Sequence, residues 1–495
     1  MTPGCGHGGP VAGRVCPHLL ADPSGDHVRR FTGAGTAFDL VCSACSTADG
    51  GHEPQPVCDE CHRKVIEESS WEGVAGTPEV RERAAGYTFA HETVGPVRLD
   101  QPVLDIQPFP RLDRQWWAAV DGGGRVLRLD LDEGTAEVLA TLPEGAVALS
   151  SRERVGLHLS PDGRFAAVVV DHGEVGTVLD LNTGRVTLEL TRGDYHSEQT
   201  PFPVAFFEID GRTLVIHGTA WNRLDVSDAA TGELLTAREL PGSGTNGQPR
   251  PEHDLDYFHG GLAVSPNGQW VADNGWVWHP FGVPSSWSAR RWVQENVWES
   301  EDGPTRRDLA GRVWHWHSPL CWVGDHRLAV WGCGRDADWL IPAGRVFDVT
   351  DGRETHWFPG PKGELAFDGD LFSFDAEAGT AVWDVDTGDR LHHEARFCPT
   401  RYHPGAKTFL TPLDGGHYRV SRLVRPTGAG FRGEPVVSLA RTIRAGRRFD
   451  LLPVLADALE EVGCSDAAVL GHCRTPGPHG GRCWVVDRVL GDPAV

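Results

Sequence analysis

Long hydrophobic runs and leader-like segments are missing from this sequence of 495 residues. No stretch approaches the ~18 consecutive apolar residues that a membrane-spanning helix needs. The opening MTPGCGHGGP holds neither a basic segment nor an apolar run, so no secretory signal is expected. We therefore predict a soluble protein with no membrane partner, located in the cytoplasm, where thiols stay reduced.

Basic residues are scarce relative to acidic ones. The chain has 46 Lys and Arg residues against 69 Asp and Glu residues, which gives a formal net charge of −23. A surface this acidic repels phosphate backbones over most of its area. The sequence thus predicts no nucleic-acid partner.

Common catalytic signatures are also absent. The chain has no G-x-S-x-G nucleophile elbow, no Walker phosphate loop and no H-E-x-x-H zinc-protease motif. Carboxylates are too numerous for a catalytic pair to be singled out. We assign no catalytic residue and no organic cofactor site, and a non-enzymatic role is favoured.

The twelve cysteines divide the chain into territories. Six lie between Cys5 and Cys61, and three lie near the end. Between these groups, short Val-, Leu-, Phe- and Trp-rich runs alternate with Gly, Asp, Asn and Pro, which is typical of short strands joined by tight turns. The predicted division is a zinc-binding module over 1–75, a linker over 76–96 with a short helix from Thr77-Pro78, a β-propeller over 97–437 and a helical module over 438–495.

Two turn signals recur along the middle of the chain. The first is an Asp-Gly or Asn-Gly turn, or its equivalent, before a strand, as in SPDGRFAAVVV from Ser160. The second is a hairpin that begins with Asp and ends with Gly, as in DLNTG from Asp180. The second follows the first by 20 to 22 residues in four units and by 27 in a fifth. This offset predicts two hairpins of one repeated unit.

Seven units of ~47 residues fit between residues 97 and 425, within the range of a four-stranded propeller blade. The predicted fold is therefore mainly β, a seven-bladed β-propeller, with six or eight blades or a tandem β-sandwich as alternatives. The fourth unit is expected to carry an inserted loop before Glu301-Asp302-Gly303. We expect Val97–Leu99 to complete the seventh blade and remove its open edge.

The segment VWDVDTG, from Val382 to Gly388, carries a Trp-Asp pair followed by a turn. In this it resembles WD-repeat and related bacterial β-propeller proteins, although most other units lack the pair. The resemblance implies a rigid platform for protein interactions and identifies no partner.

Four pairs of potential metal ligands occur before residue 62: Cys5 with His7, Cys16 with His18, Cys42 with Cys45, and Cys58 with Cys61. Two ligands close together on a turn aim their donor atoms at one point, and two such pairs make the tetrahedron that zinc prefers. The C-x2-C-x12-C-x2-C spacing favours one ion for the third and fourth pairs and another for the first and second. A cross-braced arrangement, in which alternating pairs share an ion, fits the same ligands.

Two zinc ions with four protein ligands each would be structural, because no coordination position stays open. Part of the pattern resembles the opening of the ubiquitin-hydrolase-type zinc finger. The later Cys-Gly-Arg and paired histidines of that family have no match after Cys61. A generic ribbon or treble-clef knuckle is therefore preferred, and ubiquitin-tail binding is not transferred.

Tryptophan is dense between Trp270 and Trp357. Packing between blades is the simpler interpretation of these rings, and an aromatic cage or stacking surface is the alternative. The histidines of the segment RVWHWHSP, His315 and His317, are expected to be structural or to line the central channel.

Near the end of the chain, apolar residues recur at helical spacing from Leu452 to Leu459. Gly463 is expected to end this helix and Ser465 to begin another. The Leu-Ala-Asp-Ala-Leu-Glu run and the Cys-Trp-Val-Val-Asp ending resemble a short segment at the end of uncharacterised bacterial proteins, which implies no activity. The nearby cysteines and histidines are interpreted as buried thiols and surface side chains, with a third metal site as the alternative: Cys464, His472, Cys473, His479 and Cys483.

Two functions of different classes follow. The first is a non-catalytic interaction scaffold that binds a protein or peptide on a propeller rim, with structural zinc in the N-terminal module. The alternative is a propeller enzyme, a hydrolase or lyase, whose His, Asp and Glu side chains meet in the central channel.

Overall fold

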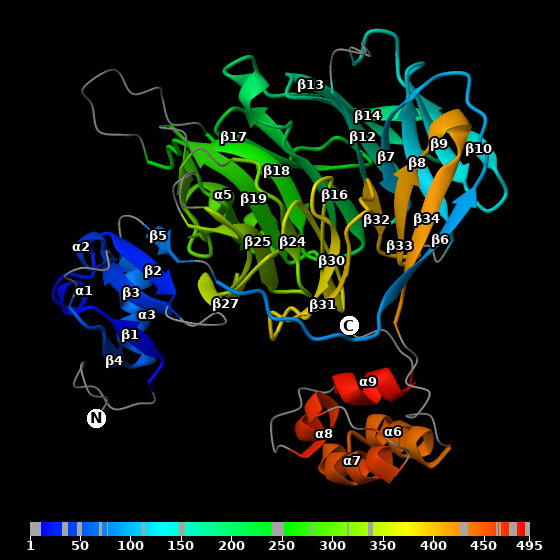
Figure 1. Cartoon of the computed structure of the whole chain (residues 1–495). Helices are drawn as coiled ribbons and strands as arrows, with labels where there is room; N and C mark the ends of the chain where they lie inside the picture. Colours follow the sequence, from blue (N-terminus) through cyan, green and yellow to red (C-terminus); the bar gives the residue numbers. More distant parts are fainter. Residues whose placement is uncertain are drawn as a thin grey trace.

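A computed structural model describes residues 11–31, 38–46, 52–68, 72–76, 78–110, 114–147, 154–239, 252–278, 281–313, 316–334, 340–425, 434–461, 464, 467–474 and 483–490. Within these ranges the chain is mainly β. Seven sheets form a ring, a small unit of strands and helices precedes it, and helices follow it (Figure 1). The predicted seven-bladed propeller is thereby confirmed.

The first three blades follow one another along the chain. Neighbouring strands within each blade are antiparallel. The strands are β7 (Val103–Pro108), β8 (Trp116–Asp121), β9 (Arg125–Asp130) and β10 (Thr135–Thr141); β11 (Arg154–Leu159), β12 (Phe165–Asp171), β13 (Val175–Asp180) and β14 (Arg185–Thr191); and β15 (Val204–Ile209), β16 (Arg212–Ala220) and β17 (Arg223–Asp228). A bridge between Ser227 and Leu234 follows β17 in the third blade.

The remaining four blades complete the ring. Their strands are β18 (Phe258–Val264), β19 (Trp270–Val277), β20 (Phe281–Gly282), β21 (Ser285–Ser288), β22 (Arg307–Asp308) and β23 (Arg312–Val313); β24 (Leu320–Trp322), β25 (Arg327–Cys333), β26 (Ile341–Asp348) and β27 (Arg353–Pro359); β28 (Glu364–Asp368), β29 (Asp370–Asp375), β30 (Gly379–Trp383) and β31 (Arg390–Glu394); and β32 (Arg401–His403), β33 (Thr408–Pro412) and β34 (Tyr418–Val424).

The repeated Asp-to-Gly hairpin joins the third strand of a blade to the outer one, or follows β17 in the third blade. Its Asp side chain accepts hydrogen bonds from backbone N–H groups two or three residues ahead, as Asp180 does from Asn182 and Thr183. The closing Gly adopts a left-handed conformation that other residues adopt only with strain. Its φ lies between +66° and +77° in all five hairpins: Gly134, Gly184, Gly232, Gly352 and Gly388. The Asp and the Gly recur in the sequence because the conformation of this turn requires them.

Buried apolar residues form a separate cluster at each of the seven junctions between neighbouring blades. Trp287 and Trp292 are fully buried at the junction of the third and fourth blades. Trp383, of the Trp-Asp pair, packs between the fifth and sixth, and its Nε1 donates to the Ser373 hydroxyl at 2.9 Å. Trp287 and Trp292 thus pack between blades, as the simpler interpretation of the tryptophan-dense stretch predicted.

The fourth blade carries the predicted insertion. Between β21 and β22 the chain forms two short helices, α4 (Ala289–Gln294) and α5 (Glu299–Asp302). Ser288 caps α4 by accepting a hydrogen bond from the Arg291 N–H at 3.3 Å. The predicted turn at Glu301-Asp302-Gly303 is therefore the end of a helix inside the insertion.

The ring closes through a strand from the N-terminal side. β34 pairs antiparallel with β6 (Thr88–Val94), from Tyr418 opposite Val94 to Val424 opposite Thr88. Closure by an N-terminal strand was expected, but from Val97–Leu99, and residues 88–94 were placed in the linker. β6 is an outer strand that buries only one of its seven side chains, Phe89. Its apolar pattern is therefore too weak to stand out in the sequence.

Residues 78–85 do not form the short helix predicted from Thr77-Pro78. They run beside the sixth blade, where Glu82 bridges Arg390 in parallel. The Arg83 N–H donates to the Arg390 carbonyl at 2.9 Å. Pairing with an open strand edge thus outweighs the local helix-start signal.

The N-terminal unit is a five-stranded sheet in the order β4-β1-β3-β2-β5, with three short helices around it. Its apolar core includes Val15, Leu40 and Val65. The elements are β1 (Gly13–Val15), α1 (Pro17–Ala21), β2 (His27–Phe31), β3 (Phe38–Cys42), α2 (Ser43–Ser46), β4 (Gln55–Val57), α3 (Asp59–Glu68) and β5 (Glu72–Ala75).

This unit docks on the fifth blade through aromatic rings. Phe31 and Phe38 contact Trp357 of β27, with ring centroids 5.1 and 5.8 Å from that of the tryptophan. Val74 shares a buried cluster with Cys333 of β25. The docked surface is thus continuous with the core of the blade.

Two buried arginines and two nearly buried glutamates cross the same interface. Arg29 of β2 is 0% exposed and donates from both terminal nitrogens to the Glu354 carboxylate of β27, at 2.9 and 3.2 Å. Its Nε lies 2.6 Å from Glu72 of β5, and Arg345 of β26 pairs with both carboxylates. Burial raises the pKa of Glu72, but Arg29 and Arg345 more than offset this and lower it to about 2. Both carboxylates are therefore held ionised.

The C-terminal helices are α6 (Glu434–Gly446), α7 (Leu452–Glu461), α8 (Ala467–Arg474) and α9 (Trp484–Leu490). Their core is built from residues 436–490, and the periodic residues from Leu452 to Leu459 are all buried in it. Burial raises the pKa of the Cys473 thiol to about 12, and the charges of Cys483 and Cys464 add to the effect. No helix in the described ranges is long and apolar enough to cross a bilayer.

Candidate metal centre and aromatic face

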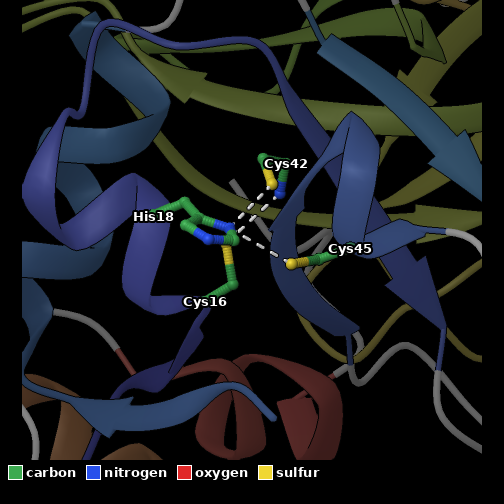
Figure 2. Close-up of side chains that lie close together, drawn as sticks. All are labelled: Cys16, His18, Cys42 and Cys45. Atoms are coloured by element: carbon green, nitrogen blue, oxygen red, sulfur yellow. Dashed lines mark hydrogen bonds between the residues drawn. The ribbon is translucent and has the colours of Figure 1, made fainter. Parts of the chain in front are cut away.

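The N-terminal unit brings two of the predicted ligand pairs together. One donor atom from each of Cys16, His18, Cys42 and Cys45 lies within 4.8 Å of the others. Figure 2 shows the His18 ring pointing at the two thiols of the other pair. Cys16 and Cys45 are buried, whereas His18 is exposed.

Parallel pairing of β1 and β3 explains this arrangement. Val15 lies opposite Leu40, and the Cys16 N–H extends the ladder by donating to the Leu40 carbonyl at 2.9 Å. Because parallel strands end at the same edge of a sheet, the turns that follow β1 and β3 lie side by side. Each turn carries one ligand pair.

The distances suit a tetrahedral zinc ion. The His18 Nδ1 lies 3.4 Å from both the Cys42 and the Cys45 Sγ. Zinc bonds of about 2.0 Å to nitrogen and 2.3 Å to sulfur give a tetrahedral N···S edge of about 3.5 Å. One imidazole and three thiols are a common structural donor set for this metal. The residues present therefore fit zinc, which His18 would bind through Nδ1.

Backbone groups support a thiolate at this centre. The Cys42 N–H donates to the Cys16 Sγ at 3.3 Å. Burial raises the pKa of the Cys42 thiol, but hydrogen bonds from Cys45 and Cys16 outweigh it and lower that pKa below 9.0. Thiolate is the form of cysteine that binds metal.

The pairing of the ligands differs from both predicted arrangements. The second pair joins the third, and Cys58 lies at the other end of β1 from Cys16. β4 runs antiparallel to β1, with Val57 opposite Gly13, so Cys58 follows near the start of β1. Cys61 lies one turn later in α3. Cys5 and His7 lie outside the described residues.

A second feature is a set of aromatic side chains at one edge of the ring. They lie in the connection between β14 and β15, at or just before the start of β18 and β24, or where β16 and β19 end. Phe258 of β18 is opposite Trp276 of β19, which fixes the two ends at one face. We call the set the aromatic patch: Tyr195, His196, Trp221, Phe258, Trp276, Trp278 and Trp316.

The aromatic patch has a buried base and exposed rings. Phe258 and Trp276 are buried and stack with centroids 4.2 Å apart and planes 7° from parallel. Trp278 is 43% exposed and Tyr195 is 48% exposed, and both contact Phe258. The patch thus combines packing with an accessible aromatic surface.

Two buried polar groups hold this surface in place. Arg192 is 4% exposed, and its guanidinium donates to the backbone carbonyls of Ser197, Thr200 and Pro201, which anchors the loop that carries Tyr195. Next to Phe258, the His259 Nδ1 lies 2.6 Å from the Asp273 carboxylate. His259 is 1% exposed, so the pair is structural.

Part of this patch was predictable from the sequence. Trp276, Trp278 and Trp316 belong to the predicted tryptophan-rich stretch, whereas Tyr195 and Trp221 lie well before it. Their only sequence signal is their place between two predicted strands. His317 is half-buried and bonds the Gln199 carbonyl at 3.1 Å, as expected for a structural histidine. Trp314 and His315 lie outside the described residues.

Similarity to known proteins adds little to this description of the fold and its sites. No protein-family model matches the chain, and no curated protein matches it. Among solved structures, a chain from the crystal structure of the Mitotic Checkpoint Complex is similar at 14% identity and a TM-score of 0.41, over 70% of this chain and 96% of that one.

Proposed function

We propose that the protein is a non-catalytic interaction scaffold that binds a basic peptide segment of a protein partner on the rim of its propeller. The observation that carries this is the aromatic patch. Trp278 and Tyr195 expose large parts of their rings at one face of a rigid ring. Surface aromatic side chains of this kind are enriched at protein interfaces.

Charge favours a cationic partner. The chain has a net charge of −23, and the exposed acidic residues Asp194 and Glu198 flank Tyr195 in the loop anchored by Arg192. Aromatic faces attract Lys and Arg side chains, with about 0.5–2 kcal/mol for each contact. An acidic surface also accelerates the association of basic partners.

Two structural zinc ions belong to the same proposal. The first is held by Cys16, His18, Cys42 and Cys45. The second is assigned to the pair Cys58 and Cys61, near the other end of β1, and the remaining predicted ligands, Cys5 and His7, lie outside the described residues. Reduced thiol ligands support a cytoplasmic location, and the VWDVDTG segment supports membership of the WD-repeat class.

The test is the binding of fluorescent peptides of equal length that are rich in Lys and Arg, or in Glu, measured by anisotropy. We expect the basic peptides to bind and the acidic ones not to bind. Trp278→Ala and Tyr195→Ala should each weaken binding about tenfold, which corresponds to about 1.4 kcal/mol. Binding should also weaken as the salt concentration rises.

Trp484→Ala is the matched control, because Trp484 is 39% exposed on the C-terminal helices. It should bind the basic peptides as the unmodified chain does. Equal binding of basic and acidic peptides, or an unchanged affinity for Trp278→Ala, would overturn the proposal.

A further inference from the structure

We propose that the C-terminal helices form a third metal site, a structural zinc centre held by Cys464, Cys473 and Cys483 through sulfur and by His472 through Nε2. The site lies in a different part of the chain from both the N-terminal zinc centre and the aromatic patch. It therefore does not depend on the proposed function.

The helices place these four side chains together. His472 and Cys473 lie in the last turn of α8, and Cys483 directly precedes α9. Cys464 follows α7, where its N–H donates to the Leu459 carbonyl at 2.9 Å. The three cysteines are 5%, 2% and 3% exposed and belong to one buried cluster.

One pair of donor atoms in this site already lies at the distance that separates two ligands of a single metal ion. The His472 Nε2 lies 3.3 Å from the Cys483 Sγ. This nearly equals the 3.4 Å between His18 Nδ1 and its two sulfur neighbours in the N-terminal centre. Both values are close to the N···S edge of a zinc tetrahedron, about 3.5 Å.

The four donor atoms of this site lie farther apart than those of the N-terminal cluster. Among the described residues, Cys16, His18, Cys42 and Cys45 are the set whose donor atoms all lie within 4.8 Å. Binding of a metal at the C-terminal site would draw Cys464 and Cys473 toward the His472–Cys483 edge. Metal should therefore stabilise α8 against α9.

A bound metal would also explain how so small a helical domain is stable. The helices span residues 434–490 and have a core of their own, made from residues 436–490. A domain of about 60 residues buries too little surface to be more than marginally stable. Three thiolates and an imidazole select zinc or another thiophilic divalent ion over calcium or magnesium.

The experiment measures metal content of the full chain, purified with a reductant and without chelator, by elemental mass spectrometry. Cys483→Ser and His472→Gln should each lose one zinc ion per chain relative to the unmodified protein. Cys398→Ser, which changes an exposed cysteine, should lose none. Cys45→Ser should lose a different ion, so that its loss and that of Cys483→Ser add. An unchanged zinc content in Cys483→Ser would overturn the site.

A second measurement covers the case in which a variant does not fold. Cys464, Cys473 and Cys483 of the unmodified chain are tested for alkylation by iodoacetamide, with and without a zinc chelator, and located by peptide mass spectrometry. A bound metal predicts strong labelling of all three only after chelation, while labelling of the half-buried Cys321 stays unchanged. Equal labelling with and without chelator would show that burial alone protects these thiols, and would overturn the proposal.

Discussion

Arg29 and Glu354 form a buried, two-pronged ion pair between residues 325 positions apart. Arg29 belongs to the N-terminal sheet, and Glu354 belongs to the outer strand of the fifth blade. Glu72 and Arg345 complete the group, so each charge faces two of opposite sign. This group of charges fixes where the N-terminal unit docks on the fifth blade. In a shifted position, at least one of the four charges would lose a partner of opposite sign.

Glu354→Gln should therefore destabilise the protein strongly. It leaves Arg29 and Arg345 with one buried carboxylate between them, and breaking a buried pair costs about 3–5 kcal/mol. We expect this decrease in the free energy of unfolding, measured in guanidinium chloride by tryptophan fluorescence. Glu137→Gln is the control, since Glu137 is exposed, its partner Arg128 is half-buried, and surface pairs contribute at most about 1 kcal/mol. Equal effects of the two substitutions would contradict this account of the interface.

Cys45→Ser should remove one zinc ion and unfold the N-terminal unit. Cys45 is a buried member of the Cys/His cluster to which we assign a zinc ion, and small metal domains lose their fold with the ion. Elemental analysis measures the first effect. Loss of protection of β1–β3 amides in hydrogen exchange measures the second, while amides of β12 in the second blade should stay protected. Full zinc content in Cys45→Ser would exclude the assigned ligand set.

The stability of the ring should fall in mild acid because of His217. Burial lowers the pKa of this histidine below 6.5, and its Nε2 bonds the Ser227 hydroxyl at 3.0 Å. The unfolded chain takes up the proton first as the pH drops through 6.5, so the free energy of unfolding falls. The slope reaches about 1.4 kcal/mol per pH unit and ends below the folded pKa.

His217→Gln isolates this effect, because acid-driven loss of any bound metal would act on both chains alike. Between pH 7 and pH 5 the variant should show a shallower loss of unfolding free energy than the unmodified protein. Parallel curves for the two chains would mean that His217 does not titrate in this way.

Two deletions should separate closure of the ring from docking of the N-terminal unit. Removing residues 1–77 keeps β6, so the seventh blade stays complete and the ring should remain folded. Removing residues 1–96 also takes away β6 and exposes the edge of β34 along its whole length. Open edges pair with other chains, so we expect aggregation, measured by size-exclusion chromatography and light scattering. A monomeric, cooperatively folding 97–495 chain would refute the role of β6.

The blades were predictable because their signals are local. An Asp that accepts from N–H groups two or three residues ahead, and a Gly with positive φ, need no information from outside the turn. The helix through Leu455 and Leu459 was found for the same reason, since its buried residues recur within one element. Blade number and the insertion in the fourth blade followed from counting these signals.

The remaining features depend on contacts between distant segments. The partner of Cys42 was set by parallel pairing of β1 with β3, which the spacing of cysteines does not encode. In the sequence, Glu354 cannot be distinguished from the exposed carboxylates of other outer strands, because its burial depends on the docking of Arg29. β6 was missed because an outer strand with a single buried side chain, Phe89, has almost no hydrophobic pattern.

Closure by β6 also orders events during synthesis of the chain. The ribosome releases Thr88–Val94 long before Tyr418–Val424, so the first strand of the closing pair waits for the last. The N-terminal sheet is complete early, and Arg29 can pair with Glu72 of the same sheet, but its second partner, Glu354, is made much later. A product that stops just before residue 418 already contains Glu354 but is an open ring in which β6 has no partner strand, a form that cellular quality control can distinguish from the finished protein.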